Sequence, residues 1–183
     1  FGTAIGNIVA ANGHATSLWM RDPDQVAESL TNRENTRYLP GHPLESLLVP
    51  TDDLESAAAD AEIIFVTVPS YGFRDICRQL APFVRKSDLL VSGTKGIEPV
   101  GFRLMSQLIA EHTTSEHIGV LSGPNFAEEI ADRHYTGSVL ASESAQVRAK
   151  VQEVMRSETF RVYPSQDIFG VELGGALKNI YAI

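Results

Sequence analysis

The sequence contains little cysteine and lysine, and it has no long run of apolar residues. Its one cysteine, Cys77, cannot form an internal disulfide, which is typical of a reducing compartment, so we expect a cytoplasmic location. No apolar run reaches the roughly 18 residues that a membrane-spanning helix needs. The 15 basic and 23 acidic side chains give a net charge of −8. This balance argues against a nucleic-acid-binding surface.

Two kinds of site are also not expected. The five histidines are scattered without the spacing of metal ligands, so we predict no metal site. Cys77 lies on the apolar face of a predicted helix, which favours a core position over a nucleophilic one. Neither Ser70 nor Ser122 stands in the G-x-S-x-G turn of serine hydrolases.

The 183 residues are 43% hydrophobic and 21% charged, the composition of a globular protein with a sizeable core. Segments of helical periodicity alternate with short apolar segments, which indicates a doubly wound, mostly parallel α/β sheet. The apolar run EIIFVTV at 62–68 predicts a strand covered by helices on both faces. The predicted strands are 15–20, 47–49, 62–68, 88–92, 118–121, 136–141 and 160–163. The predicted helices lie around 4–12, after Pro23, around 73–80, at 102–111, from Asn125, at 144–155 and from Asp167 onward.

The chain has one predicted domain boundary, near Pro164 and Ser165, where a long helix with several glycines begins in place of another strand. Near the start, Gly13 follows a helical run as a helix-ending glycine would, although the pair Asn12-Gly13 also fits a hairpin turn. The chain starts without Met inside one predicted helix and ends inside another, so we expect a fragment.

Two features fit a dinucleotide site. Gly2 opens a helix, as the third glycine of a G-x-G-x-x-G turn does, although a glycine there also serves close packing alone. Arg21 and Asp22 follow a predicted strand, at the place where dinucleotide folds contact the adenosine ribose. An acid there binds the 2′-hydroxyl and an arginine a 2′-phosphate. If Asp22 instead caps the helix that begins at Pro23, Arg21 is left for phosphate, which favours NADPH.

Two of only four lysines stand in glycine-rich settings. Lys95 follows a predicted strand in SGTKG, where open α/β sheets bind ligands, although an exposed turn lysine has the same pattern. Lys178 lies one helical turn after Gly174 and Gly175, each of which costs a helix about 1 kcal/mol relative to alanine. We expect a cationic, ligand-sized pocket over these glycines. Close helix packing with a lysine that reaches water is the alternative. Asn179 follows and can orient a ligand by a hydrogen bond.

The segment Ser122-Gly123-Pro124-Asn125 lies at another predicted strand end. Asn125 and Glu128 have the spacing of a helix capping box, which gives them a purely structural role. The same turn aims free backbone N–H groups at a ligand. Because Glu128 and Glu129 oppose an anion there, we expect a neutral hydroxyl or carbonyl group to bind.

Six segments in this order resemble the bacterial NAD(P)-dependent glycerol-3-phosphate dehydrogenases, over essentially the whole chain. They are Trp19-x-Arg21-Asp22, Asn35-x-x-Tyr38-Leu-Pro-Gly41, Val68-Pro69-Ser70, Thr94-Lys95-Gly96-Ile97, SGPNFAE at 122–128 and GVELGGALKN at 170–179. The resemblance implies that residues 1–164 form a Rossmann-like NAD(P)-binding domain without its first strand. Residues 165–183 would then begin an all-helical substrate domain.

The resemblance also implies a reaction, the reversible reduction of dihydroxyacetone phosphate to sn-glycerol 3-phosphate, which supplies phospholipid synthesis. Lys178 is then the proton donor, with Lys95 and Asn179 as further catalytic residues. The resemblance is compatible with either NADH or NADPH as the cofactor. It is also compatible with a homodimer. The implied substrate residues are Lys95, Gly123, Asn125 and Lys178. The implied cofactor residues are Phe1, Gly2, Arg21, Tyr38, Pro69, Lys95 and Ala127.

Two other functions share parts of this pattern. A 3-hydroxyacid or 6-phosphogluconate type of dehydrogenase also joins a Rossmann domain to a helical one with a Lys-Asn pair, but with a different loop in place of SGPNFAE. A regulatory module that senses a dinucleotide without catalysis would leave Lys95 and Lys178 without a purpose.

Overall fold

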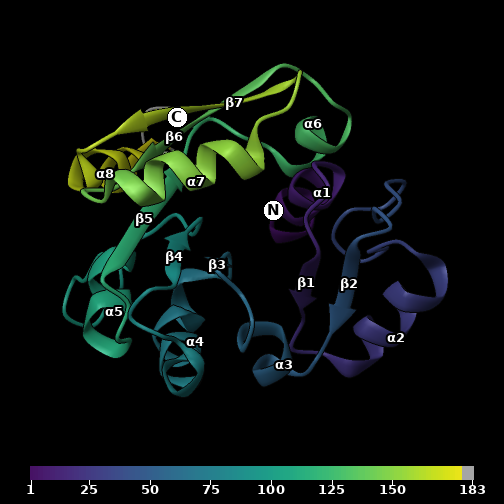
Figure 1. The fold of residues 1–183 in the computed structure, drawn as a ribbon, viewed down its shortest axis with the longest axis horizontal. Coiled ribbons are helices and arrows are strands. Elements are labelled where there is room, and N and C mark those ends of the chain that lie inside the picture. Colours follow the sequence, from purple (N-terminus) through teal and green to yellow (C-terminus); the bar gives the residue numbers. More distant parts are fainter. Residues whose placement is uncertain (179–183) are drawn as a thin grey trace.

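The computed structural model of the chain describes residues 1–178. They form an α/β fold in which seven strands and eight α-helices alternate along the chain (Figure 1). The helices are α1 (Gly2–Ala11), α2 (Pro23–Asn32), α3 (Leu54–Ala58), α4 (Phe73–Leu80), α5 (Met105–His112), α6 (Ala127–Ala131), α7 (Ala145–Met155) and α8 (Ile168–Leu177). Two 3₁₀ turns, Ser70–Gly72 and Ala81–Phe83, flank α4. The predicted α/β class is confirmed.

The strands form two separate, mostly parallel groups. One group pairs β1 (Thr16–Trp19) with β2 (Leu48–Thr51) in parallel. The other has the order β3 (Ile63–Val66), β4 (Leu89–Ser92), β5 (His117–Ser122), β6 (Thr136–Ala141) and β7 (Phe160–Ser165). Only the β5–β6 pair is antiparallel. The carboxyl ends of β3, β4 and β5 therefore meet at one edge of the sheet.

Helices cover both faces of the inner strand β4, whose residues are all buried. Leu89 and Val91 pack into a core beside α1 and α7, whereas Leu90 packs into a second core beside α4 and α5. This alternation follows from the period of two residues in a strand. Figure 1 shows α7 on one side of β4 and α4 and α5 on the other.

The edge strand β3 differs from its prediction. Ile63, Ile64 and Phe65 are only half-buried, although the apolar run predicted a strand covered on both faces. The reason is that β3 pairs only with β4 and borders a cavity of about 800 Å³, which lies between it and β1. The apolar run at 62–68 thus predicted full burial. The residues of β4 are fully buried in this way, whereas those of β3 are buried only in part.

Local signals at the helix ends are mostly confirmed. Asp22 caps α2 by accepting a hydrogen bond from the Asp24 amide, with Pro23 as the first helical residue. Gly13 follows α1 with a φ of +89°, a conformation that suits glycine, so the helix-ending interpretation holds. The short helix α3, capped by Asp53, was not predicted.

Two boundaries were predicted wrongly. Asn125 does not cap α6, which begins at Ala127 without any side-chain cap, because the Asn125 side chain is buried against Ser138 instead. Strand β7 continues past the predicted residue 163 to Ser165 and includes Pro164. Proline is tolerated there because β7 is an edge strand, where one side of the backbone needs no partner. In the described part of the chain, no helix is long and apolar enough to cross a membrane.

Candidate functional site

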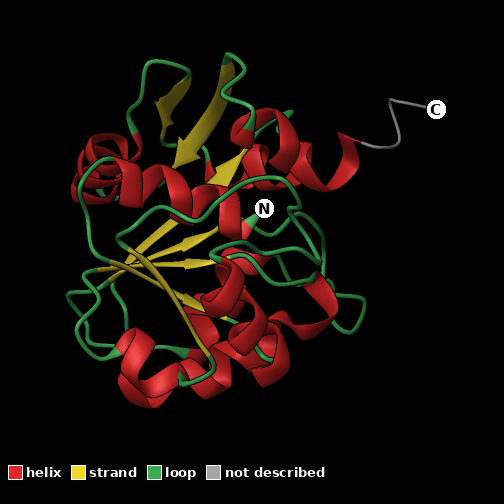
Figure 2. Cartoon of the chain, turned by 90° about the vertical axis from the view of Figure 1, so that its right-hand side faces the viewer, coloured by secondary structure: helices red, strands yellow, loops and turns green. Residues whose placement is uncertain are grey.

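The candidate site lies at the carboxyl ends of the parallel strands, where Thr67, Gly93 and Gly123 follow β3, β4 and β5. Figure 2 shows the N-terminus of the chain beside the arrowhead ends of these strands. Phe1 and the start of α1 therefore face the same edge. Ligands of open α/β sheets bind in this position.

Small residues allow α1 to approach the strand ends. A Cβ atom on Gly2 would lie 2.5 Å from Thr67 Oγ1, closer than real contacts allow. A Cβ on Gly93 would lie 3.1 Å from the Phe1 ring. Gly2 is thus needed for close packing of α1, and this packing brings the helix N-terminus to the strand ends.

The N-terminus of α1 is suited to hold an anion. The first three helical N–H groups have no partner within a helix, and Phe1, at the N-cap, offers no side-chain cap. No acidic residue stands in the first turn. Free N–H groups together with the helix dipole attract phosphate groups, so this terminus fits the pyrophosphate of a dinucleotide.

Lys95 is half-buried just after β4. Its Nζ donates a hydrogen bond of 2.7 Å to the Gly123 carbonyl, which follows β5, and lies 5.9 Å from the centre of the Phe1 ring. Burial lowers the pKa of Lys95 from 10.5 to about 8, and the nearby Lys178 ammonium adds to this shift. Lys95 thus connects α1 with the ends of two strands.

Lys178 follows α8, and its Nζ lies 5.2 Å from the centre of the Phe126 ring. Its charge acts on Lys95, so the structure brings together two lysines that are 83 positions apart in the chain. We call Lys95 and Lys178 the lysine pair. Asn179 lies outside the described residues.

The two glycines of α8 have different surroundings. A Cβ on Gly175 would collide with Ser122 Oγ and would lie 3.7 Å from Lys95 Cγ. A Cβ on Gly174 would meet nothing within 4 Å. The expected ligand-sized pocket over both glycines is therefore not formed at Gly175, because Ser122 and the Lys95 stem occupy that surface. Gly175 instead lets α8 pack on the end of β5.

Gly123 and Asn125 form a tight corner beside the lysine pair. A Cβ on Gly123 would lie 2.8 Å from Asn125 Oδ1 and 2.9 Å from the Gly137 carbonyl. Asn125 is only 6% exposed, and its amide donates to Ser138 Oγ. Its Oδ1 atom has no hydrogen-bond partner among residues 1–178. A buried polar atom without a partner costs about 1–3 kcal/mol, so Oδ1 marks a place for a donor from a ligand.

The end of β1 is held by surface charges. Besides capping α2, Asp22 forms an ion pair with Arg37, whose Nη1 lies 2.5 Å from Asp22 Oδ2. Arg37 also forms an ion pair with Glu28, at 3.1 Å between Nε and Oε2. The hydrogen bond from Arg37 lowers the pKa of Asp22, and hydrogen bonds from Thr36 and then Arg37 lower the pKa of Glu28. Arg21 is exposed and forms no ion pair within residues 1–178. Arg37 was not predicted, since nothing in its spacing links it to Asp22.

The remaining predicted cofactor residues lie apart from one another. Tyr38 is 71% exposed, and no described contact links it to the strand ends. Pro69 is exposed and begins the turn after β3. The next residue, Ser70, packs against Gly96 of the loop that follows β4 and carries Lys95, which we call the Lys95 loop. Ala127 is the half-buried first residue of α6.

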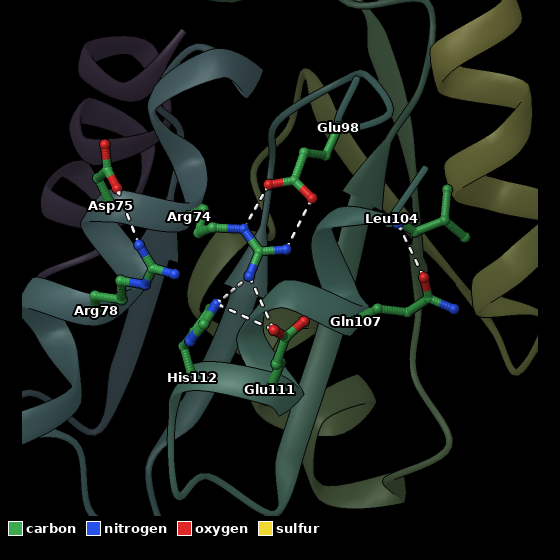
Figure 3. A network of polar contacts seen from close by, with 8 residues as sticks. All are labelled: Arg74, Asp75, Arg78, Glu98, Leu104, Gln107, Glu111 and His112. Atoms are coloured by element: carbon green, nitrogen blue, oxygen red, sulfur yellow. Dashed lines mark hydrogen bonds and ion pairs between the residues drawn. The ribbon is translucent and has the colours of Figure 1, made fainter. Parts of the chain in front are cut away.

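Two polar networks behind the lysine pair were also missed. Arg74 of α4 binds Glu98 of the Lys95 loop as well as Glu111 and His112 of α5 (Figure 3). Separately, the buried Glu172 of α8 accepts hydrogen bonds from the amide and hydroxyl of Ser106 at the start of α5. Only the charge of these residues is visible in the sequence, and that is common on protein surfaces.

Other reactive groups do not join the site. Cys77 is fully buried, as predicted, and burial raises the pKa of its thiol to about 12. This thiol therefore stays protonated and unreactive. Among residues 1–178, no three His, Cys, Asp or Glu side chains gather as a metal site would require.

Comparison with known proteins gives the family. Residues 1–148 match the family described as NAD-dependent glycerol-3-phosphate dehydrogenase N-terminus. Curated relatives include glycerol-3-phosphate dehydrogenases [NAD(P)+] from Saccharophagus degradans and Teredinibacter turnerae. Both are 52% identical over the whole chain, which spans 51% and 54% of their length.

Solved structures agree. A glycerol-3-phosphate dehydrogenase from Coxiella burnetii superposes with a TM-score of 0.93 at 33% identity, covering 98% of this chain and 55% of that one. The enzyme from Saccharomyces cerevisiae gives 0.88 at 29% identity, covering 98% and 57%. A UDP-D-ManNAc dehydrogenase from Pyrococcus horikoshii, at 13% identity and a TM-score of 0.74, shares the fold alone. The chain thus spans about half the length of its relatives, and it belongs to the family of NAD-dependent glycerol-3-phosphate dehydrogenases.

Proposed function

We propose that this protein reduces dihydroxyacetone phosphate to sn-glycerol 3-phosphate, reversibly, with a nicotinamide cofactor. The observation that carries this proposal is the lysine pair at the strand ends, beside the unpartnered Asn125 Oδ1. A cationic group next to a carbonyl is what a ketone reduction needs, because negative charge grows on the oxygen as hydride arrives. The names of the relatives agree with this reaction.

The residues around α1 support a dinucleotide as cofactor. The uncapped N-terminus of α1 would hold the pyrophosphate, and Gly2 and Gly93 give the helix its close approach to the strand ends. The nicotinamide group, when bound, supplies or accepts the hydride. Lys95 lies within the same edge and would contact cofactor and substrate together.

The surroundings of Arg21 favour NADPH over NADH. Asp22 is engaged by Arg37 and by the Asp24 amide, so it has less capacity to accept a bond from a ribose 2′-hydroxyl. Arg21 has no acidic partner within the described residues and is free to bind a 2′-phosphate. Initial rates with each reduced cofactor measure this preference, and a strong preference for NADH would contradict it.

We assign the proton transfer to Lys178 and the positioning of substrate to Lys95, Gly123 and Asn125. Lys95 already donates one hydrogen bond to the Gly123 carbonyl and keeps further N–H groups for substrate oxygens. Asn125 Oδ1 would accept a hydrogen bond from a substrate hydroxyl. The lowered pKa of Lys95 fits a site in which two ammonium groups share little water.

We further propose that residues 1–164 form a Rossmann-like domain whose sheet takes one more strand between β1 and β3. Each of these strands is paired on one side only, and the cavity of about 800 Å³ separates them. Residues 165–183 would begin a helical substrate domain. A cytoplasmic location and a homodimer complete the proposal, and light scattering measures the assembly state.

The test is turnover of dihydroxyacetone phosphate in a chimaera. In it, residues 1–183 replace the matching half of the Saccharophagus degradans relative. We expect Lys178→Ala to lower kcat by about 10²- to 10⁴-fold with cofactor binding retained. The matched control is Lys150→Ala, on α7, since that lysine forms a 3.6 Å surface pair with Glu153. Unchanged turnover in Lys178→Ala, or cofactor binding without turnover in the parent, would favour a dinucleotide sensor.

A further inference from the structure

The loop that carries Lys95 is fixed on both sides of this lysine. On one side, Thr94 Oγ1 donates to the Val68 carbonyl at 2.7 Å, which ties the loop to the end of β3. On the other side, Glu98 lies three residues beyond Lys95, and its amide donates to the Arg103 carbonyl at 2.9 Å. Lys95 itself donates a hydrogen bond to the Gly123 carbonyl. The position of the Lys95 amine thus also depends on how Thr94 and Glu98, on either side of it in the chain, are held.

The carboxylate of Glu98 is held by one guanidinium group. Arg74 Nε lies 2.5 Å from Glu98 Oε1, and Nη2 lies 2.8 Å from Oε2, so the pair is bidentate (Figure 3). The Glu98 side chain is only 11% exposed. Bidentate arginine–carboxylate pairs fix orientation as well as distance, in contrast to single ion pairs. Arg74 also lowers the pKa of Glu98, which keeps this carboxylate ionised.

Arg74 is in turn fixed by α5. Its Nη1 donates to Glu111 Oε1 at 2.9 Å and lies 2.7 Å from His112 Nε2 (Figure 3). All three guanidinium nitrogens are therefore engaged, and the group joins α4, α5 and the Lys95 loop. None of these contacts reaches Gly123, Asn125 or Lys178, so Arg74 can act on the site only through the loop.

The other lysine is fixed to the same helix. Glu172 of α8 accepts a 2.9 Å bond from the Ser106 amide at the start of α5, and Lys178 lies six residues later, directly after the end of α8. Glu111 and His112 lie at the end of α5. The two ends of α5 thus hold the two segments that carry the lysine pair.

We infer that Arg74 is a positioning residue for the proposed reaction, because through Glu98 it holds Lys95 at the distance from Lys178 that the substrate requires. This inference rests on the proposed function only for its kinetic readout. Arg74 touches no reacting atom. Its loss would let the loop of residues 95–98 relax, while Thr94 and β4 stay in place.

The test compares Arg74→Gln and Glu98→Gln with Arg78→Gln in the chimaera described above. Arg78 lies one turn further along α4 and forms an exposed 3.7 Å pair with Asp75, so it is the matched control (Figure 3). We call Arg74→Gln and Glu98→Gln the clamp variants, because each removes the ion pair between Arg74 and Glu98. We expect kcat to fall about 10- to 100-fold in both clamp variants, with little change in the cofactor KM. Arg74→Lys, which keeps the charge, should recover part of kcat.

A second readout needs no turnover. Amine labelling of Lys95, followed by mass spectrometry across pH without substrate, reports its titration. In the parent, the pKa of Lys95 should be about 8. In both clamp variants this pKa should rise toward 10.5, since Lys95 moves toward water and away from Lys178. Arg78→Gln should titrate as the parent does.

The outcomes separate the two proposals. If the parent does not reduce dihydroxyacetone phosphate, the proposed function fails, while the labelling still tests the role of Arg74. If both clamp variants match Arg78→Gln in kcat and in labelling, the inference is overturned. If Arg74→Gln loses its cooperative thermal transition, the same two measurements on Glu98→Gln decide the question. That variant removes only the charge of Glu98 within the loop.

Discussion

The two ends of the candidate site hold their charged groups by different means. At the lysine pair, the supporting side chains Glu98 and Glu172 are largely buried and are fixed by two hydrogen bonds each. At the end of β1, Arg21 and Arg37 are exposed and Arg37 is held by surface ion pairs. Surface pairs contribute little to stability and are screened by salt.

This difference matches what each end is proposed to do. Proton transfer and charge neutralisation need atoms held within a fraction of an ångström, which buried bonds achieve. A ribose phosphate contributes binding at the surface, where a flexible arginine is sufficient. Buried polar contacts thus support the lysine pair, whereas exposed ion pairs hold the end of β1.

The largest effect that would break this comparison is expected from Gly175→Val. The new side chain would collide with Ser122 and press on the Lys95 stem, so α8 and Lys178 would be displaced. We expect about 1–3 kcal/mol of destabilisation and a loss of kcat of about 100-fold. Urea unfolding and initial rates measure both.

Gly174→Ala is the matched control, one residue away and facing open space. Removing a mid-helix glycine should stabilise the protein by about 0.5–1 kcal/mol with kcat unchanged. Equal effects of the two substitutions would mean that the close contact at Gly175 has no role.

A smaller effect is expected from Arg21→Ala. If this arginine binds the 2′-phosphate, the KM for NADPH should rise about 10-fold, equivalent to the loss of one charge-assisted bond of about 1.4 kcal/mol. The KM for NADH serves as an internal control and should stay within a factor of two. Parallel changes for both cofactors would remove Arg21 from the phosphate site.

The smallest effect is the pH dependence of stability caused by Glu172. Burial raises the pKa of this carboxyl above 4.5, despite the bonds from Ser106. The folded state therefore binds the proton more tightly than the unfolded state. Its contribution to stability is then greatest at low pH and declines as the pH rises from about 4.5 through the raised value.

Glu172→Gln removes this titration and keeps an oxygen that can accept from the Ser106 amide. The free energy of unfolding of the variant, relative to the parent, should increase between pH 4 and pH 7. Urea unfolding at several pH values measures the difference. A difference that decreases over this range would contradict the raised pKa.

Much of the fold could be predicted because its signals are local. Asp22 and Pro23 start α2 by capping and a fixed φ, and Gly13 ends α1 with a positive φ. The apolar runs of the strands are also local. Strand pairing is not, so nothing in the run at 62–68 indicated that β3 has only one partner.

The site was predictable in part. The types of the residues that follow the strands, such as Lys95 and Asn125, indicated a polar ligand, and the resemblance to a family linked Lys178 to them. The pocket expected over Gly174 and Gly175 was wrong at Gly175, because the approach of Ser122 depends on how α8 packs on β5. The cap expected at Asn125 failed for a similar reason, since its partner Ser138 comes from β6.

By itself, the sequence determined the α/β class, the start of α2, the end of α1 and the presence of rare lysines in glycine-rich segments, since each depends on neighbouring residues. Only the tertiary structure decided that Lys95 and Lys178 share one site, and that α5 holds both segments that carry them. The contacts that do this, from Arg74 to Glu111 and from Ser106 to Glu172, join residues 37 and 66 positions apart. Such contacts form when helices pack on a sheet, and no local pattern in the chain encodes them.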